Sequence, residues 1–256
     1  MTSTLVIQSH TDPLPHVWLR RCIETVQQWC HQNNYQYRWM GDELLDGLEQ
    51  SLLKKVEDQI VVASDLGRLH AIRTGLETHD RVVWLDTDFL VFDATNFVLP
   101  SANDNPLNYR VGREVWVQED QTNPAKLKAY VKVHNAFLLF DRGNSFLDFY
   151  IEHATKMLRE CTGKIPPQFI GPKLLTAIHN VIGCPVLETA GMLSPSVIDD
   201  LLSDGERCCA LNLMHKRSQS NLAGANLCSS LVGQSSESER NMNRLIDLLL
   251  SLPDGL

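Results

Sequence analysis

The chain has 256 residues, 43% of them hydrophobic, and carries a formal net charge of −8 at pH 7. This length suits one globular domain, and the acidic balance argues against a nucleic-acid surface and against charge-driven binding to anionic membranes. No apolar run approaches the ~20 residues of a membrane span, the N-terminus shows no signal peptide, and the seven cysteines contain no Cys-x-x-Cys pair. We therefore expect a single domain over residues 1–256 in a reducing cytoplasm.

The N-terminal third predicts strands that alternate with helices. Short apolar runs bounded by polar loops indicate the strands, and apolar residues that recur every three or four positions indicate the helices. The predicted strands cover residues 4–8, 35–40 and 82–85, and the predicted helices cover residues 17–30, 41–53 and 64–77.

The remaining two thirds predict further strands at 108–117, 133–140 and 208–213. Helices are expected at 145–161, from Gly171-Pro172 onward, and at 241–252, since proline is accepted in the first helical turn. We expect the apolar final helix to pack back on the domain. Dimerisation or shallow membrane association through this helix is the alternative.

The segment from Arg81 to Asp93 organises the chain. Its apolar run ends in two carboxylates, Asp86 and Asp88, that lie two residues apart and so point the same way in an extended segment. Such a run suits a strand buried on both faces of a mixed, mostly parallel sheet, where ligands bind beyond the carboxyl ends of the strands. Paired carboxylates at that place favour a hard cation, Mg²⁺ or Mn²⁺. The alternative is a plain turn with solvated carboxylates.

Three other residues attract attention near the predicted helix 64–77 and the strand 208–213. Asp65 and Arg68 lie three apart and share a helix face, which also fits an ordinary intrahelical ion pair behind a Ser64 N-cap. His215 follows the last predicted strand and is the best placed further metal ligand, although eight other histidines are present.

Several of these segments resemble glycosyltransferases that carry the DXD motif, nearest to glycosyltransferase family 32. The match is most specific at 63–69 (Ala-Ser-Asp-Leu-Gly-Arg-Leu) and 83–88 (Val-Trp-Leu-Asp-Thr-Asp). Weaker matches follow at 135–137, at 171–176 and at His215 with Ser218. The family's usual Gly-Gly pair before the central strand is replaced here by Thr-His-Asp-Arg at 78–81.

The resemblance implies a Rossmann-like GT-A fold and a metal-dependent hexosyltransferase-type enzyme of polysaccharide or glycoconjugate synthesis. Its donor would be a UDP- or GDP-sugar, its metal Mn²⁺ or Mg²⁺, its acceptor a sugar, lipid-linked or protein hydroxyl, and the anomeric configuration would be retained. Loops 96–106 and 218–239 are the expected acceptor loops. The implied metal ligands are Asp86, Asp88 and His215, the implied catalytic residues are Asp65, Arg68, Asp86 and Asp88, and the implied donor-binding residues further include Gln8, Ser9, His10, Asn135, Gly171 and Ser218.

Two other functions compete with this interpretation. A strand that ends in Asp-x-Asp also opens haloacid-dehalogenase-type phosphatases, and Asp199-Asp200 could imitate their later acidic pair. Such an enzyme would release phosphate from p-nitrophenyl phosphate. The second alternative is an inactive nucleotide-sugar-binding protein, which would bind nucleotide with Mn²⁺ and show no turnover.

Overall fold

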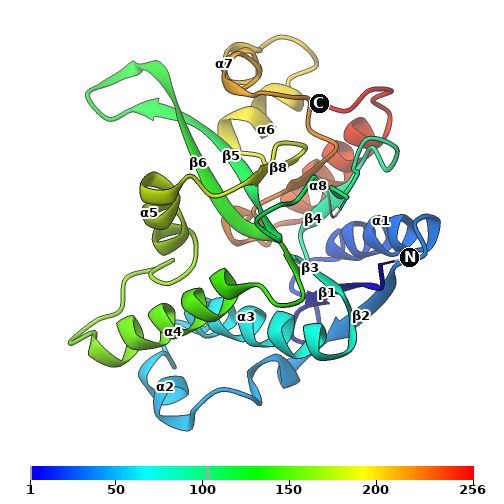
Figure 1. Ribbon diagram of the computed structural model, residues 1–256. Coiled ribbons are helices and arrows are strands. Elements are labelled where there is room, and N and C mark those ends of the chain that lie inside the picture. Colours follow the sequence, from blue (N-terminus) through cyan, green and yellow to red (C-terminus); the bar gives the residue numbers. More distant parts are fainter. Residues whose placement is uncertain (1, 102–103) are drawn as a thin grey trace.

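The computed structural model describes residues 2–101 and 104–256, and two sheets form its centre (Figure 1). The larger sheet has six strands in the order β2-β1-β3-β6-β5-β7, and the smaller has three in the order β4-β9-β8. The strands are β1 (Thr4–Ser9), β2 (Gln36–Met40), β3 (Arg81–Leu85), β4 (Phe89–Val91), β5 (Tyr109–Asp120), β6 (Asn123–Asp141), β7 (Val186–Leu187), β8 (Ala190–Met192) and β9 (Gly224–Asn226).

The six-stranded sheet is mixed and mostly parallel, as expected. Strand β1 is parallel to β2 and β3, β7 is parallel to β5, and β6 is antiparallel to both β3 and β5. Every residue of β3 is buried. Alternate side chains of β1 and β3 point to opposite faces, with Val82 and Trp84 in one apolar cluster and Val83 and Leu85 in another. Helices cover both clusters, which explains the continuous apolar run in the sequence.

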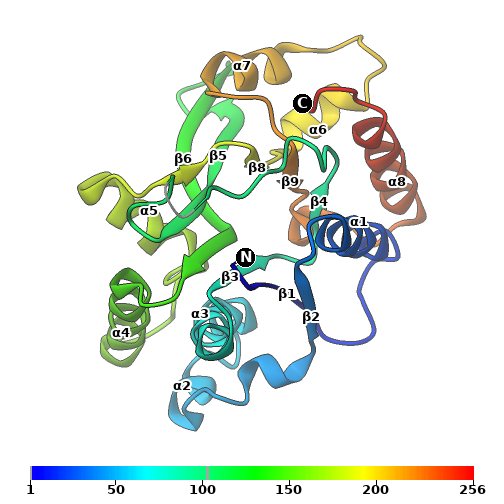
Figure 2. The same cartoon turned by 45° about the vertical axis from the view of Figure 1, so that its right-hand side comes forward.

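Helices α3 and α4 lie on one side of β1 and β3, and α1 lies on the other (Figure 2). Two short 3₁₀ segments, 42–45 and 229–231, lie in the connections. The helices are α1 (Leu19–Gln32), α2 (Gln50–Lys55), α3 (Ile60–Thr78), α4 (Ser145–Glu160), α5 (Pro172–Ile182), α6 (Pro195–Leu201), α7 (Cys209–Arg217) and α8 (Ser236–Leu250).

The prediction of a last strand at 208–213 is wrong, because this segment begins helix α7. The N-terminal amides of α7 find a distant acceptor: the Asp200 carboxylate accepts hydrogen bonds from the backbone N–H of Ala210 and Leu211, at 2.7 and 3.0 Å. A side chain on α6 therefore satisfies donors that no local cap supplies, and the sequence pattern around 208–213 does not reveal it. The last strand, β9, lies instead within the segment 218–239, which the sequence presents as a loop.

The final helix packs against the domain, as expected. Its apolar stripe of Met242, Leu245, Ile246 and Leu249 is buried in a cluster shared with α1, α6 and α7. Its Glu239 carboxylate also accepts hydrogen bonds from the backbone N–H groups that precede α1. In the part of the chain that the structure describes, no helix combines the length and apolarity needed to cross a membrane.

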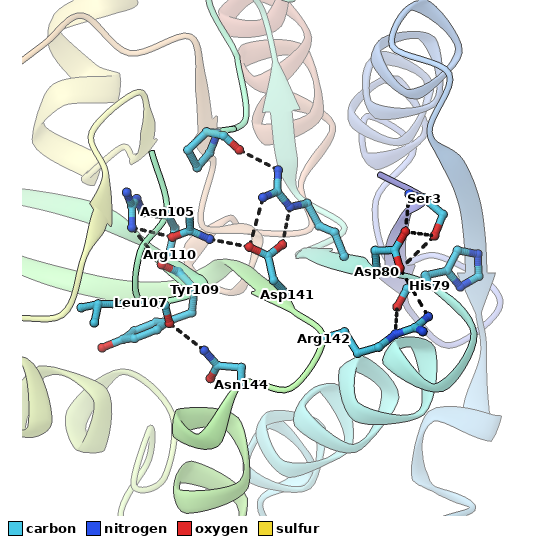
Figure 3. A network of polar contacts seen from close by, with 12 residues as sticks. Ser3, His79, Asp80, Asn105, Leu107, Tyr109, Arg110, Asp141, Arg142 and Asn144 are labelled. Atoms are coloured by element: carbon cyan, nitrogen blue, oxygen red, sulfur yellow. Dashed lines mark hydrogen bonds and ion pairs between the residues drawn. The ribbon is translucent and has the colours of Figure 1, made fainter. Parts of the chain in front are cut away.

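At the N-terminal end of β3, a closed polar network ties the sheet to the loop 96–106 (Figure 3). Asp141 accepts hydrogen bonds from Arg81 Nε at 2.6 Å, from Arg81 Nη2 at 3.1 Å and from Asn105 Nδ2 at 2.7 Å. Arg81 also donates to the Pro100 carbonyl at 2.7 Å. The loop 96–106 was expected near an acceptor site, but none of its described residues lines the cavity, and Pro100 and Asn105 lie at the opposite end of β3 from Asp86. Residues 102–103 of this loop lie outside the described chain.

Candidate active site

A cavity of about 620 Å³ lies at the carboxyl ends of β1 and β3. Polar side chains converge on it from the loops after β1, β2 and β3, from α3 and β6, and from β9 with the segment that follows it. This is the edge of an open α/β sheet where ligands are expected to bind. The lining includes Ser9, His10, Asp65, Arg68, Asp86, Asp88 and Asn135, so seven of the residues singled out in the sequence meet here.

The loop that carries the two aspartates is held from both sides. Thr87 Oγ1 donates to the Ser9 carbonyl at 2.6 Å, and Gln8 Nε2 donates to the Asp86 carbonyl at 3.1 Å. Gln8 is fully buried and does not line the cavity, so it positions the loop instead of bordering a ligand. The backbone N–H of Asp86 donates to the Ala136 carbonyl at 2.9 Å. These hydrogen bonds fix the position of the loop, which contains no glycine.

The Asp86 and Asp88 side chains have different partners. Asp86 Oδ1 accepts a hydrogen bond from Trp84 Nε1 at 2.7 Å and forms an ion pair with Arg68 Nη1 at 2.9 Å. Asp88 is held from the C-terminal part of the chain, because its Oδ1 accepts from Asn226 Nδ2 at 2.6 Å and its Oδ2 from the Ser229 backbone N–H at 2.7 Å. Both carboxylates line the same cavity.

Asp65 and Arg68 form a buried cluster with Asn135. Asn135 Nδ2 donates to Asp65 Oδ1 at 2.8 Å, Arg68 Nη2 lies 3.3 Å from the same oxygen, and Arg68 Nη1 donates to the Asn135 carbonyl at 2.8 Å. The expected N-cap at Ser64 is wrong: α3 begins at Ile60, and the Ser64 hydroxyl donates to the carbonyl of that residue, one turn back.

This cluster contains polar atoms without partners. Asp65 Oδ2 and Arg68 Nε are buried and form no hydrogen bond with any residue that the structure describes. Gly171 makes room for Asp65, because a Cβ atom at that position would lie 2.3 Å from Asp65 Oδ2. Unsatisfied buried polar groups are rare in native proteins and call for an explanation, of which a bound ligand is one.

The charges at this edge are unbalanced. The carboxylates of Asp65, Asp86 and Asp88 share one guanidinium, that of Arg68. Desolvation, opposed by Arg68 and reinforced by Asp88, raises the pKa of Asp86 to about 6. Desolvation also raises the pKa of Asp65, against the lowering effects of Arg68 and Asn135. A cation at this edge would stabilise the ionised forms.

The oxygen atoms present fit a hard divalent cation. Asp86 Oδ2 accepts no hydrogen bond within the described residues, each Asp88 oxygen keeps a free lone pair, and Asn226, Ser229 and Ser230 add amide and hydroxyl oxygens to the lining. No group of three or more His, Cys, Asp or Glu side chains suited to a metal occurs in residues 2–101 and 104–256. A cation here would therefore depend on two carboxylates plus neutral oxygens.

Four expected site residues do not line the cavity: Gln8, Gly171, His215 and Ser218. His215 lies exposed on α7, and Ser218 follows the end of that helix; neither lines the cavity. The geometry thus does not support His215 as a third metal ligand, because the segment expected to be a strand leading into the site is a surface helix. The C-terminal residues that reach the site are instead Asn226 and Ser229, which donate hydrogen bonds to Asp88. The sequence offered only their proximity to a serine-rich loop as a signal.

The acidic pair considered for a phosphatase also lies elsewhere. Asp200 binds the N-terminal amides of α7, and Asp199 is exposed on α6. Neither residue lines the cavity that contains Asp86 and Asp88. The structure therefore does not assemble the acidic constellation that the phosphatase interpretation requires.

Comparison with known proteins agrees with this architecture. No protein-family model matches the chain, and no curated protein matches it by sequence. Among solved structures, the chain is similar to a glycosyltransferase involved in the glycosylation of the major capsid of PBCV-1, with a TM-score of 0.50 and 13% identity over 94% of this chain and 99% of the other. The fold is that of GT-A glycosyltransferases.

Two further solved structures are similar at lower TM-scores. They are the PaToxG glycosyltransferase, at 0.43 with 12% identity over 98% of this chain and 87% of the other, and mouse xyloside xylosyltransferase 1, at 0.41 with 10% identity over 91% and 100%. Because the identities are this low, the activity has to be argued from the site.

Proposed function

We propose that this protein is a metal-dependent glycosyltransferase that moves a sugar from a UDP- or GDP-sugar to an acceptor hydroxyl in polysaccharide or glycoconjugate synthesis. The observation that carries the proposal is the meeting of Asp86, Asp88 and Asp65 around Arg68, in one cavity at the carboxyl edge of a GT-A sheet. Three carboxylates with one guanidinium suit a divalent cation, and the cation suits a diphosphate.

Each residue has a distinct part in this proposal. Asp86 and Asp88, with Asn226 and Ser229, would hold Mn²⁺ or Mg²⁺, which would neutralise charge on the departing diphosphate. Asp65 Oδ2 and Arg68 Nε, which lack partners, would bind donor hydroxyl or phosphate oxygens.

The reaction balances without any further reagent. A bond forms between the acceptor oxygen and the anomeric carbon, the bond from that carbon to the phosphate oxygen breaks, and the hydroxyl proton leaves with the diphosphate. No separate base is needed if the phosphate takes that proton on the same face, which accords with retention.

A thermal-shift screen tests the donor half of the proposal. UDP, GDP and their sugars are compared with and without Mn²⁺, followed by measurement of nucleoside diphosphate release. We expect one nucleotide to raise the melting temperature only with the cation, and its sugar to be consumed slowly without acceptor. Nucleotide binding with no turnover across the donor panel would support an inactive binding protein instead. Release of phosphate from p-nitrophenyl phosphate would support a phosphatase.

A further inference from the structure

The β5–β6 hairpin forms an arm that extends past the site edge of the sheet. Leu85, the last residue of β3, pairs with Phe137, and the β5–β6 ladder continues beyond this point to Asp120 and Asn123. The arm projects from the body of the molecule in Figure 1. Trp116 of β5 and Asn135 and Ala136 of β6 line the cavity, so the arm forms one of its walls. The arm is longer than its pairing with β3 requires.

The two faces of this arm differ. Side chains on its back, among them Val117 and Leu127, pack with α6 and α7. On the front, Trp116 of β5 lies opposite Tyr130 of β6, and Gln118 lies opposite Lys128. Trp116 lines the cavity, so the front face is continuous with the candidate active site.

The front face combines aromatic rings with cations. Trp116 Nε1 donates to Gln118 Oε1 at 3.1 Å, which fixes the indole plane. The ammonium groups of Lys128 and Lys132 lie 5.1 and 5.6 Å from the centroid of the Tyr130 ring. Both distances fall within the range of cation–π attraction, so the lysines are held beside the aromatic pair.

Positive charge is concentrated here in an acidic protein. Three of the nine lysines of the chain, Lys126, Lys128 and Lys132, fall within seven residues, although the net charge is −8. Lys132 is 3.8 Å from Glu114, whereas Lys126 and Lys128 form no ion pair with any described residue. Asp120 at the end of β5 is near enough to feel the charge of Lys128, but neither the Lys126 nor the Lys128 ammonium is engaged in a direct ion pair with a described residue.

The order of strands assigns the parts of the cavity. Its lining runs from Gly41 after β2 and His10 after β1, past Asp86 after β3, to Trp116 on β5. With the diphosphate at the central carboxylates and the nucleoside at the β1–β2 end, the β5 end is left for the acceptor. This step rests on the proposed function.

We propose that the front of the arm binds an acidic sugar acceptor, with a sugar ring packed on Trp116 and an anionic group paired with Lys128. The C–H face of a pyranose is apolar and suits a fixed indole, as aromatic side chains provide large contact area at low entropic cost. A carboxylate or a phosphate on the same glycan carries the negative charge that would form an ion pair with the Lys128 ammonium. A neutral glycan would leave the Lys128 ammonium without a direct ion pair.

Ligand-observed NMR titrations without donor or metal test this binding directly. The probes are trigalacturonate against maltotriose, and glucose 6-phosphate against glucose. We expect wild type to bind the anionic member of at least one pair about tenfold more tightly, and 0.5 M NaCl to reduce this preference. The trisaccharide pair reports a carboxylate, and the monosaccharide pair reports a phosphate.

Variants decide which residues are responsible. Lys128→Gln should abolish the anionic preference, Trp116→Leu should weaken both members of the preferred pair, and the exposed Lys216→Gln on α7 is the matched control that should keep wild-type binding. An equal affinity for anionic and neutral probes, or an unchanged preference in Lys128→Gln, overturns the inference. Titration of UDP and GDP with Mn²⁺ into the same samples is separate: absence of nucleotide binding counts against the proposed function, whatever the sugars do.

Discussion

The two ends of β3 place similar residues in opposite situations. At its N-terminal end, Nε and Nη2 of Arg81 donate hydrogen bonds to Asp141, and the third guanidinium nitrogen, Nη1, donates to a carbonyl oxygen. At its C-terminal end, Arg68 is shared between Asp65 and Asp86, and buried atoms of Asp65 and Arg68 have no partner. One end is satisfied within the fold, and the other has polar capacity left over.

The unsatisfied polar groups mark the end of β3 at which a ligand can bind. A buried ion pair with all its hydrogen bonds made stabilises a conformation and has nothing to offer a ligand. At the other end, the carboxylates outnumber the cations and the pKa of Asp86 is raised. This uncompensated negative charge lies in a cavity, where a bound cation can neutralise it. Substitutions at the two ends should therefore separate stability from activity.

The largest effect is expected at the satisfied end. Asp141→Ala would leave the Arg81 guanidinium buried without its carboxylate, which costs about 3–5 kcal/mol. We expect urea unfolding to show this loss, while turnover per folded molecule stays at the wild-type value. Asp141→Asn, which keeps one acceptor oxygen, should lose less. Asp80→Ala removes a half-exposed pair with Arg142 and two exposed hydrogen bonds from Ser3, and it serves as the exposed control, with a smaller shift.

The reverse outcome is expected at the site end. Asp88→Asn should reduce metal-dependent turnover at least about 100-fold, since a neutral amide is a poor ligand and cannot offset cation charge. The amide keeps only one of the two hydrogen bonds that Asn226 Nδ2 and the Ser229 N–H donate to Asp88, so turnover is compared per folded molecule, and the loss of stability should be smaller than in Asp141→Ala. Asp199→Asn on the surface of α6 is the matched control. Full activity in Asp88→Asn would refute the site assignment.

The pH dependence of stability distinguishes the ionised groups. Burial raises the pKa of Asp86 to about 6, so its contribution is present at low pH and is lost as pH rises through that value. Burial lowers the pKa of His134 to about 4, so its contribution is present above the ordinary histidine pKa and is lost as pH falls toward 4. In wild type the two trends oppose each other between pH 6 and 4.

Asp86→Asn removes one of these opposing trends. Unfolding free energy in this variant should fall more steeply than in wild type from pH 6 to 4, by on the order of 2–3 kcal/mol. Urea titrations at several pH values measure the slope. Parallel curves for the two proteins would show that the ionised Asp86 carboxylate does not destabilise the fold. The inference that negative charge is uncompensated at this end of β3 would then be wrong.

A smaller effect is expected at Asp65. Asp65→Asn keeps the shape and, with its amide oxygen at the Oδ1 position, the hydrogen bond from Asn135, but it replaces the unpartnered Oδ2 with an N–H donor. We expect kcat/KM for the donor to fall about tenfold with little change in melting temperature. If melting falls by several degrees and the kinetics do not change, the cluster is structural, like the Arg81–Asp141 pair.

The smallest effect is expected at His215. Because this residue is exposed on α7 and does not line the cavity, His215→Ala should leave both the Mn²⁺-dependent thermal shift and turnover unchanged. Loss of the metal-dependent shift in this variant would mean that α7 moves to the site when ligand binds.

The sequence by itself determined the centre of the molecule. The run of apolar residues at 82–85 predicts a strand covered on both faces, which β3 is, and carboxylates directly after it are expected at the sheet edge. The mixed sheet, the cavity around Asp86 and Asp88, and the meeting of Asp65, Arg68 and Asn135 all follow from local pattern and resemblance.

Only the tertiary structure decided the rest, because the deciding contacts join residues far apart in the chain. Asp200 satisfies the amides of α7, so the segment around 208–213 is a helix and His215 lies outside the site. Asn226 and Ser229 reach Asp88 across about half the chain, and the loop at 96–106 is drawn to Arg81 and Asp141 at the far end of β3. Periodicity reports which face of an element is buried, whereas hydrogen-bond partners of polar groups depend on which elements become neighbours.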